Sequence, residues 1–456
     1  MLPCLHTSPI NPVVFRGPSA SLMEEGNLIL GRVSRLDAFS AYSGGTISFN
    51  LNLDTAVFQG DALLPRGGTL TVRGSITNRN AMLAATGGTL ALEGTLVHHG
   101  QIQTSGSGTV TLTDTAPTGG GTLTANPGGM IRLANGFTNA GLGTSAALLL
   151  EGGTIALSSS GTMTNATGKT IRGCGTLLES GQALDNQGLL EATGNLTVNG
   201  AVTNSGNTIR ISGAGRNLNL NAGLANSGLG GIAAGATLRA STVTNSGRIS
   251  LDEAGMTVTG HLSFMPDGYL DDNGKASGLT GHGNLTNQSA ATGQFAFTHS
   301  STTIFSLGLV GKPHDITWLA ADFGAELAGF DSNMAIGSMA FGDGLGMPGS
   351  DTCSFSAETI LYAYGLRVHE DAALDLRGAT LYYLREGLEY NGIRGTGLQL
   401  DGSYKNGKII EIIPEPRVPA LFALFALFAL LLGCGLLSRR RQRTGGSVAL
   451  WGAATR

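Results

Sequence analysis

Apolar and polar residues alternate along most of the chain between about residues 44 and 300. The alternation is clearest in GTLTVRG at 68–74, GTVTLTD at 108–114, NLTVNG at 195–200 and MTVTG at 256–260. A period of two residues turns one face of a strand inward and the other toward water. Threonine and valine favour this pleated backbone, and no long stretch shows helical spacing. The pattern therefore predicts many short β-strands.

One phrase returns within this region. It reads LDNQGLL at 184–190, VTNSGNTI at 202–209, LANSGLGGI at 224–232 and VTNSGRI at 243–249. Its asparagines, with Asn165 as the first, are 21, 18, 22 and 19 residues apart. A period near twenty indicates a solenoid, in which no single repeat can bury its apolar face alone. Asn-x-Gly fits a corner, because both residue types tolerate positive φ. The predicted corner residues are Asn186, Gly188, Asn204, Gly206, Asn226, Gly228, Asn245 and Gly247.

These patterns predict an all-β fold: a right-handed parallel β-helix of roughly ten to twelve coils, each of about 20 residues. An antiparallel sandwich also has many short strands, but it does not require one phrase at one period. We expect an ill-defined N-terminal segment over 1–43, the β-helix repeats over 44–300 and a β-rich C-terminal cap over 301–412. The cap region has more aromatic residues and fewer copies of the phrase.

The end of the chain has a different composition. Residues Val418–Leu437 are twenty in number, carry no charge and consist mainly of Leu, Phe and Ala. A helix of this length spans about 30 Å, the thickness of the hydrocarbon core of a bilayer. A buried helix of a soluble protein would show a polar stripe instead. The basic residues after this segment predict that the body lies outside the cytoplasm; they are Arg439, Arg440, Arg441 and Arg443.

The order of these features, from Ile413 to Arg443, resembles the PEP-CTERM sorting signal of Gram-negative bacterial surface proteins. This signal is also catalogued as the ice-binding protein C-terminal domain. The resemblance implies that Pro414, Glu415 and Pro416 are recognised by an exosortase-type processing enzyme while 418–437 lies in the inner membrane. It also implies a location at the cell surface or in the extracellular matrix and a link to exopolysaccharide or biofilm. Residues 360–416 are similar to the stretch that often precedes such tails.

The two ends depart from the family pattern. Family members normally begin with a cleaved signal peptide, and the first residues here have neither a basic nor a sufficiently long apolar stretch. We therefore expect the export signal to lie outside the sequence as written. Residues 444–456 follow the arginine cluster and are expected to form a disordered tail.

Candidate chemistry is sparse. The net charge of −4 gives no argument for nucleic acid. We predict no catalytic residue, metal or cofactor. The four cysteines are too far apart in the sequence for a metal or redox motif. The DDNG turn at 271–274 fails the spacing of a calcium loop and is expected to be solvated. His98 and His99 are interpreted as an exposed variant of Asn-x-Gly.

We therefore predict a non-enzymatic, exported surface or matrix protein whose partners are an exosortase-type enzyme, membrane lipid and extracellular polysaccharide. One alternative is a β-helix polysaccharide lyase or hydrolase, which would need several carboxylates in one groove. Another is a glycan- or ice-binding adhesin with an unbroken threonine face, suggested by Thr-x-Thr positions such as those at 109–113.

Overall fold

The computed structural model describes short strands from Val14 onward and most of the chain between Thr69 and Ile413. Side chains are described from Ser75. Within that range the structure leaves out 80–81, 86, 207, 289–294, 305–313, 332, 343, 346, 348–349 and 358, and also the side chains of 82–84, 295 and 301–304. The fold belongs to one compact unit, Met1–Glu411.

Most strands of the described residues belong to a parallel sheet of 33 strands. Its first sixteen strands are β1 (Val14–Phe15), β2 (Ser21–Leu22), β3 (Leu28–Leu30), β4 (Arg35–Leu36), β5 (Phe39–Ala41), β6 (Thr46–Phe49), β7 (Thr55–Phe58), β8 (Ala62–Leu64), β9 (Thr69–Asn78), β10 (Met82–Ala85), β11 (Thr89–His98), β12 (Gln101–Thr104), β13 (Thr109–Leu112), β14 (Thr122–Ala125), β15 (Met130–Leu133) and β16 (Leu148–Leu157). It continues with β18 (Thr170–Leu177), β20 (Leu189–Val198), β22 (Thr208–Ile211), β23 (Asn217–Leu220), β25 (Leu229–Ile232), β26 (Thr237–Ala240), β28 (Arg248–Leu251), β29 (Gly255–Val258), β31 (Tyr269–Asp271), β32 (Gly278–Gly281), β34 (Phe295–Ile304), β36 (Ile336–Phe341), β38 (Ile360–Ala363), β39 (Gly365–Val368), β41 (Thr380–Leu384), β44 (Gly397–Leu400) and β46 (Lys408–Ile412).

A second parallel sheet has eleven strands and is called the eleven-strand sheet below. Its strands are β17 (Thr162–Asn165), β19 (Ala183–Asn186), β21 (Ala201–Asn204), β24 (Leu224–Asn226), β27 (Val243–Asn245), β30 (Leu262–Phe264), β33 (Leu285–Asn287), β35 (His314–Trp318), β37 (Asp351–Phe355), β40 (Ala372–Asp375) and β45 (Ser403–Lys405). An antiparallel hairpin of β42 (Glu389–Tyr390) and β43 (Ile393–Arg394) and a 3-10 turn, η1 (Leu327–Phe330), complete the described elements.

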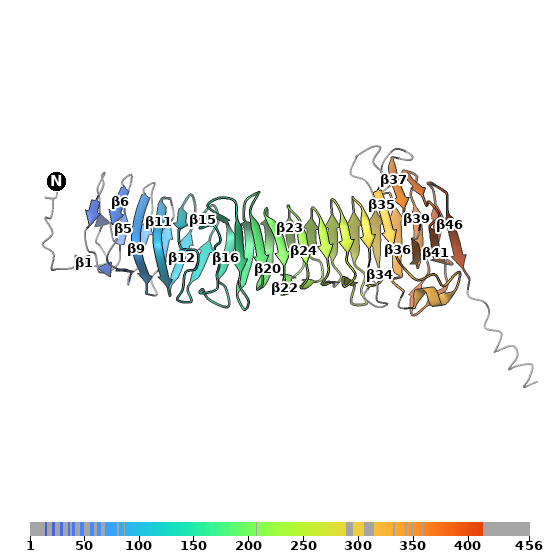
Figure 1. Cartoon of the computed structure of the whole chain (residues 1–456), viewed down its shortest axis with the longest axis horizontal. Helices are drawn as coiled ribbons and strands as arrows, with labels where there is room; N and C mark the ends of the chain where they lie inside the picture. Colours follow the sequence, from blue (N-terminus) through green and yellow to red (C-terminus); the bar gives the residue numbers. More distant parts are fainter. Residues whose placement is uncertain are drawn as a thin grey trace, which may run out of the picture. The chain divides into compact units, whose positions relative to one another are not determined.

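In the middle of the chain, each coil has one strand in the eleven-strand sheet and two in the larger sheet. The coil that begins with β21 continues through β22 and β23, and the next coil repeats the order with β24, β25 and β26. Each strand pairs in parallel with its equivalent one coil later. The result is a right-handed parallel β-solenoid of about 13 turns, with coils of about 21 residues (Figure 1). The predicted parallel β-helix and its repeat length are confirmed, and the number of turns is slightly above the expected ten to twelve.

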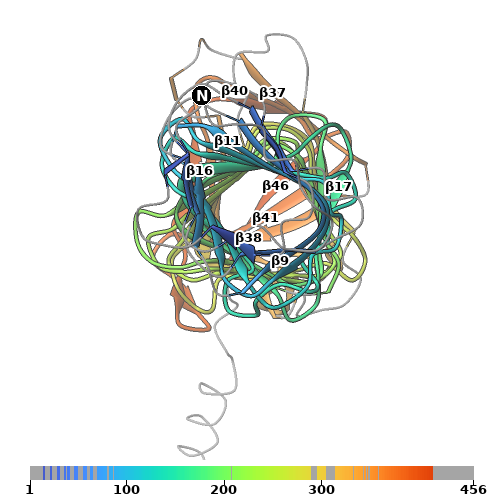
Figure 2. The same cartoon turned by 90° about the vertical axis from the view of Figure 1, so that its left-hand side faces the viewer.

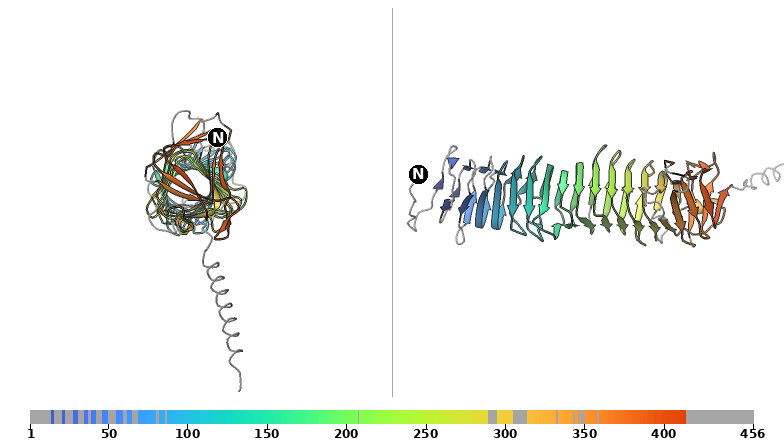
Figure 3. Two further views of the ribbon diagram at one scale, coloured as in Figure 1. Left: turned by 90° about the vertical axis from the view of Figure 1, so that its right-hand side faces the viewer. Right: turned by 90° about the horizontal axis from the view of Figure 1, so that it is seen from above.

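The coils superpose around a common axis (Figure 2). Apart from the hairpin of β42 and β43, the described strands beyond residue 300 join the same two sheets. In the eleven-strand sheet, β33 pairs with β35, β35 with β37, β37 with β40 and β40 with β45. Seen from above, these strands follow the same line as the earlier ones (Figure 3). Region 301–412 therefore extends the stack of coils.

The interior is filled by columns of equivalent apolar residues. One column runs across five successive coils, and every member is at most 3% exposed. Each buried side chain of this size stabilises the fold by roughly 1.5–3 kcal/mol relative to its exposed state. Because a one-residue slip would turn the whole column outward, the column also fixes the register of the coils. Its members are Leu196, Leu218, Leu238, Met256 and Leu279.

A ladder of asparagine side chains runs along the eleven-strand sheet. Asn139, Asn165, Asn186, Asn204 and Asn226 each donate from Nδ2 to Oδ1 of the asparagine one coil later, and the last bond reaches Asn245. The N···O distances are 2.6–2.7 Å, and all six side chains are at most 2% exposed. Buried amides of this kind are tolerated because each finds a partner.

Around residues 319–334 the chain leaves the stack and covers the outer side of β38 and β41. The ring of Phe330, in η1, packs 4.6 Å from that of Tyr364. Tyr362 stacks on Tyr382 at 4.6 Å and donates its hydroxyl to the carbonyl of Gly324 at 3.0 Å. The excursion therefore holds a small aromatic cluster outside the main core.

Asn204→Ala is expected to destabilise the solenoid more than the same change on its surface. It removes the acceptor of Asn186 and the donor of Asn226, and each buried group left without its partner costs roughly 1–3 kcal/mol. Urea unfolding measures the difference, with Asn195→Ala, at an exposed asparagine, as the control. Equal midpoints for the two variants would show that the ladder adds nothing.

Candidate functional site

The predicted sorting signal lies outside the described residues. This applies to Pro414, Glu415 and Pro416, to the apolar segment 418–437, and to the arginine cluster that begins at Arg439. Within the part of the chain that the structure describes, no helix combines the length and apolar character needed to cross a bilayer.

The predicted corner residues occupy equivalent places on successive coils, but the positive φ expected for them is not the feature that they share. The asparagines end their strands with side chains turned inward, and none has a positive φ. Of the predicted glycines, only Gly206 does, at 125°. At Gly188 an added Cβ would collide with the carbonyl oxygen of Lys169, and at Gly247 with that of Gly228. Close approach of the neighbouring coil therefore explains glycine at these two positions.

His98 corrects a second expectation. Its side chain is buried, with 0% exposure, and occupies the asparagine position of its coil opposite Asn78. Nε2 donates to the carbonyl of Thr122 at 3.0 Å, and Nδ1 accepts from Asn78 Nδ2 at 3.1 Å. The imidazole fits because residue 121 is glycine, where an added Cβ would meet the ring. Of the two adjacent histidines, His98 is buried and His99 is exposed.

Burial lowers the pKa of His98 below its ordinary value of 6.5, so the side chain is neutral near pH 7. The neutral form also matches the hydrogen bonds, because a proton on Nδ1 would face the Asn78 amide group. His98 therefore places a side chain that can titrate at an asparagine position of the coil.

His98→Asn is expected to make the solenoid more resistant to acid. Below pH 6.5 the unfolded chain gains a proton that the folded state excludes, so wild type loses stability by up to about 1.4 kcal/mol per pH unit until the folded pKa is reached. The variant lacks this loss. Urea unfolding at pH 7 and pH 5 checks it, with His99→Asn as the matched control. The same pH dependence in wild type and His98→Asn would contradict the assignment.

The two aspartates of the DDNG turn are buried, which corrects the expected solvated turn. Asp271 is 3% and Asp272 2% exposed. Asp271 accepts from Arg248 Nε at 2.8 Å and from Ser250 Oγ at 2.7 Å. Asp272 accepts from the backbone N–H groups of Gly274 and His299 and from the Ser300 hydroxyl. Both carboxylates therefore join neighbouring coils, and the described residues contain no group of three or more His, Cys, Asp or Glu arranged to hold a metal.

The threonines of the larger sheet form an interrupted line. Thr89 and Thr109 are paired one coil apart, and the line continues through Thr154, Thr176 and Thr197. Residues of other kinds replace threonine within it. They are Met130, Asn219 and Arg239. This line therefore does not form the unbroken threonine face that an ice-binding surface would require.

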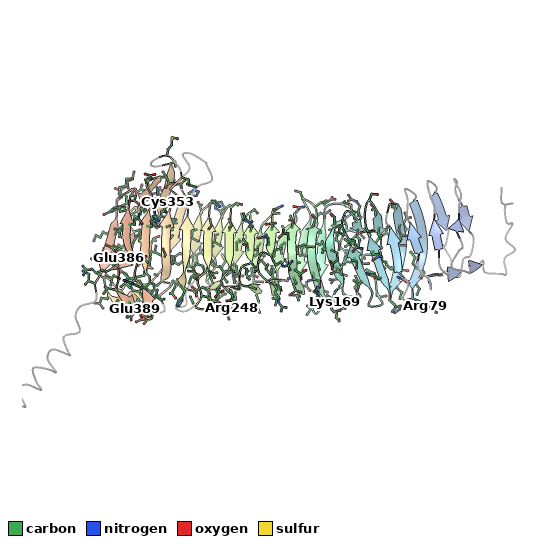
Figure 4. All side chains as sticks on the ribbon, turned by 180° about the vertical axis from the view of Figure 1, so that it is seen from behind. Arg79, Lys169, Arg248, Cys353, Glu386 and Glu389 are labelled. Atoms are coloured by element: carbon green, nitrogen blue, oxygen red, sulfur yellow. The ribbon has the colours of Figure 1, made fainter. Side chains whose placement is uncertain are left out.

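A groove of about 600 Å³ lies on the outer face of β37, β40 and β45, near the C-terminal end of the solenoid. Cys353 and Leu374 point from its floor into the core. Figure 4 shows Cys353 at the same end of the stack as Glu386 and Glu389, with Arg79 at the other end. We call this groove on β37, β40 and β45 the terminal groove. It is lined by Thr352, Cys353, Ser354, Ala373, Leu374, Asp375, Arg377, Ser403, Tyr404 and Lys405.

Two outward lines of side chains shape the terminal groove. Thr352, Ala373 and Ser403 are paired across the three strands and are all small. Ser354, Asp375 and Lys405 form the parallel line two residues along each strand. The hollow therefore follows from short side chains that lie beside the longer, charged Asp375 and Lys405.

Asp375 lies between two cations. Its Oδ1 accepts from Asn406 Nδ2 at 3.0 Å, and its Oδ2 is 3.9 Å from Arg377 Nε and 4.0 Å from Lys405 Nζ. The hydrogen bond from Asn406, followed by the nearby charges of Lys405 and Arg377, lowers the pKa of this carboxyl, so it is ionised at neutral pH. With one carboxylate and two cations, the groove has a charge of +1.

Arg377 has a backbone conformation that is unusual for a residue with a side chain. Its φ is 47°, in the left-handed region, where a non-glycine residue pays roughly 1–2 kcal/mol. The guanidinium Nη2 donates to Ser354 Oγ at 3.2 Å, one coil back. Strained residues of this kind tend to cluster at ligand sites.

The cysteine of the groove floor is not a chemical group of the site. Cys353 is 1% exposed, and burial raises the pKa of its thiol to about 12, so it stays protonated. Cys174 and Cys353 are both free thiols.

Fold and site together define a parallel β-solenoid protein with a polar, mixed-charge groove on the last strands of its eleven-strand sheet. Comparison of the chain with protein-family models, curated proteins and solved structures returned no match.

Proposed function

We propose that the chain is a non-enzymatic surface or matrix protein of a Gram-negative bacterium, exported and sorted through its C-terminal signal. Residues 418–437 hold it in the inner membrane with the solenoid outside the cytoplasm. An exosortase-type enzyme recognises Pro414, Glu415 and Pro416, and the solenoid then reaches the cell surface or matrix.

The observation that carries this proposal is where the folded body ends. The last strand of the described residues, β46, ends at Ile412, and Pro414 begins the recognition triplet two residues later. A cut after the triplet would leave every strand that the structure describes on the released side. A long stack of coils suits a structural role, because it offers an extended surface.

The terminal groove also favours binding over hydrolysis. Its lining includes a single carboxylate, Asp375, whereas hydrolysis or lysis of a glycosidic bond normally uses a pair. Asp375 is ionised between two cations, which suits an acceptor of hydrogen bonds and not a general acid. The enzyme alternative therefore gains no support from this site.

Replacing Pro414, Glu415 and Pro416 together by alanine should abolish processing but not membrane attachment. The full chain, behind a cleavable export leader, is expressed in Gram-negative hosts with and without an exosortase. Wild type should stay in the membrane fraction without the enzyme and lose its apolar tail when the enzyme is present. Immunoblots of membrane and soluble fractions, with mass measurement of the released product, follow both steps.

Replacement of Arg439, Arg440, Arg441 and Arg443 by asparagine is the companion variant, because it alters the topology signal and leaves the triplet intact. Equal processing of wild type and the triplet variant would contradict the proposed recognition. Recovery of the whole unprocessed chain in the soluble fraction would contradict the membrane attachment.

A further inference from the structure

We propose that the terminal groove binds a polysaccharide that carries carboxylate groups, such as a chain rich in uronic acids. This role rests on the proposed function, because a surface location is what brings the solenoid into contact with the polymer. Binding itself involves no residue of the sorting signal.

The shape of the groove suits an extended chain. The line of Thr352, Ala373 and Ser403 crosses three strands, and neighbouring strands in a sheet are about 4.8 Å apart. A polymer that lies along the solenoid axis therefore meets one small residue per strand on the floor. On its flank it meets the parallel line that contains Asp375 and Lys405.

The polar groups match both parts of an acidic sugar. Asp375 accepts hydrogen bonds from sugar hydroxyls, and such bonds to a charged group are stronger than neutral ones. Arg377 and Lys405 approach Asp375 no closer than 3.9 Å, which is beyond a direct hydrogen bond. Their N–H groups are therefore not used by Asp375 and can donate to a ligand. A guanidinium can bind a carboxylate through two parallel hydrogen bonds. The charge of +1 then favours an acidic polymer over a neutral one.

The same sheet face continues the polar surface away from the groove. Outward hydroxyl side chains recur one per coil along it, broken by alanine at 225. The row runs beside the groove and does not enter it, because Thr317 lies two residues along β35 from Asp315, which pairs with Ser354 of the groove. A polymer longer than the groove would lie next to this row and next to the exposed Asp315. The row consists of Thr203, Thr244, Ser263, Thr286 and Thr317.

Arg377 is one of seven described non-glycine residues with a positive φ, and it is the one whose side chain lines the groove. Glycine would adopt its φ of 47° without strain, and the residue after it is already glycine, at φ 96°. An arginine here weakens the turn, and its guanidinium is held over the groove by Ser354. This is expected where a side chain is retained for binding and not for stability.

The test measures binding of the full chain, held in a detergent micelle, to oligogalacturonate by isothermal titration calorimetry. Neutral cello-oligosaccharide of equal length and a poly-glutamate peptide are the comparison ligands. Oligogalacturonate should bind at least about tenfold more tightly than either, with an affinity that falls as salt rises. Lys405→Gln and Arg377→Gly should each weaken it by at least about tenfold, and Lys408→Gln, outside the groove, should not.

Arg377→Gly separates binding from folding. Because glycine relieves the strained backbone, its unfolding midpoint in urea should rise while its affinity falls. A fall in both would show that Arg377 is structural, and unchanged affinity in both groove variants would overturn the proposal. Poly-glutamate bound as tightly as oligogalacturonate would overturn the saccharide assignment in favour of an acidic peptide. Failed sorting in cells would leave this binding intact, so the two proposals fail separately.

Discussion

The parallel pairing of each coil with the next is the constraint on which the structure depends. A strand bonds to its equivalent one coil away, so interior positions of the same kind meet: Leu196 meets Leu218, and Asn186 meets Asn204. Stacking like on like fills the interior with apolar side chains and lets buried amides bond to one another. A single buried asparagine would be costly, whereas a column of them satisfies itself except at its ends.

The repeated part of this architecture could be predicted from the sequence. Alternation gave the strands, and the spacing of Asn165, Asn186 and their successors gave the coil length. The burial of single residues could not be predicted, because it depends on the neighbouring coil. His98 is buried since residue 121, in the next coil, is glycine. Asp271 is buried since Arg248 and Ser250, one coil earlier, bond to it.

The terminal groove was not predicted because it arises where the repeat becomes irregular. Ser354, Asp375 and Lys405 are aligned in space although 21 and 30 residues separate them. The longer interval contains the hairpin of β42 and β43, whose turn has Asn391 and Gly392 at φ 52° and 77°. An Asn-Gly pair is a strong local signal for such a hairpin. If this hairpin is recognised as an insertion between coils, the repeat register continues across it and places Asp375 next to Lys405.

The asparagine ladder also has a direction. From Asn139 to Asn226 every amide donates toward the C-terminus, so the dipoles are aligned and each bond polarises the next. A duplicated or deleted whole coil would rejoin donor to acceptor, whereas a partial one would place an amide opposite an apolar side chain. Evolution can therefore change the length of this protein in steps of one coil, about 4.8 Å, without altering its cross-section.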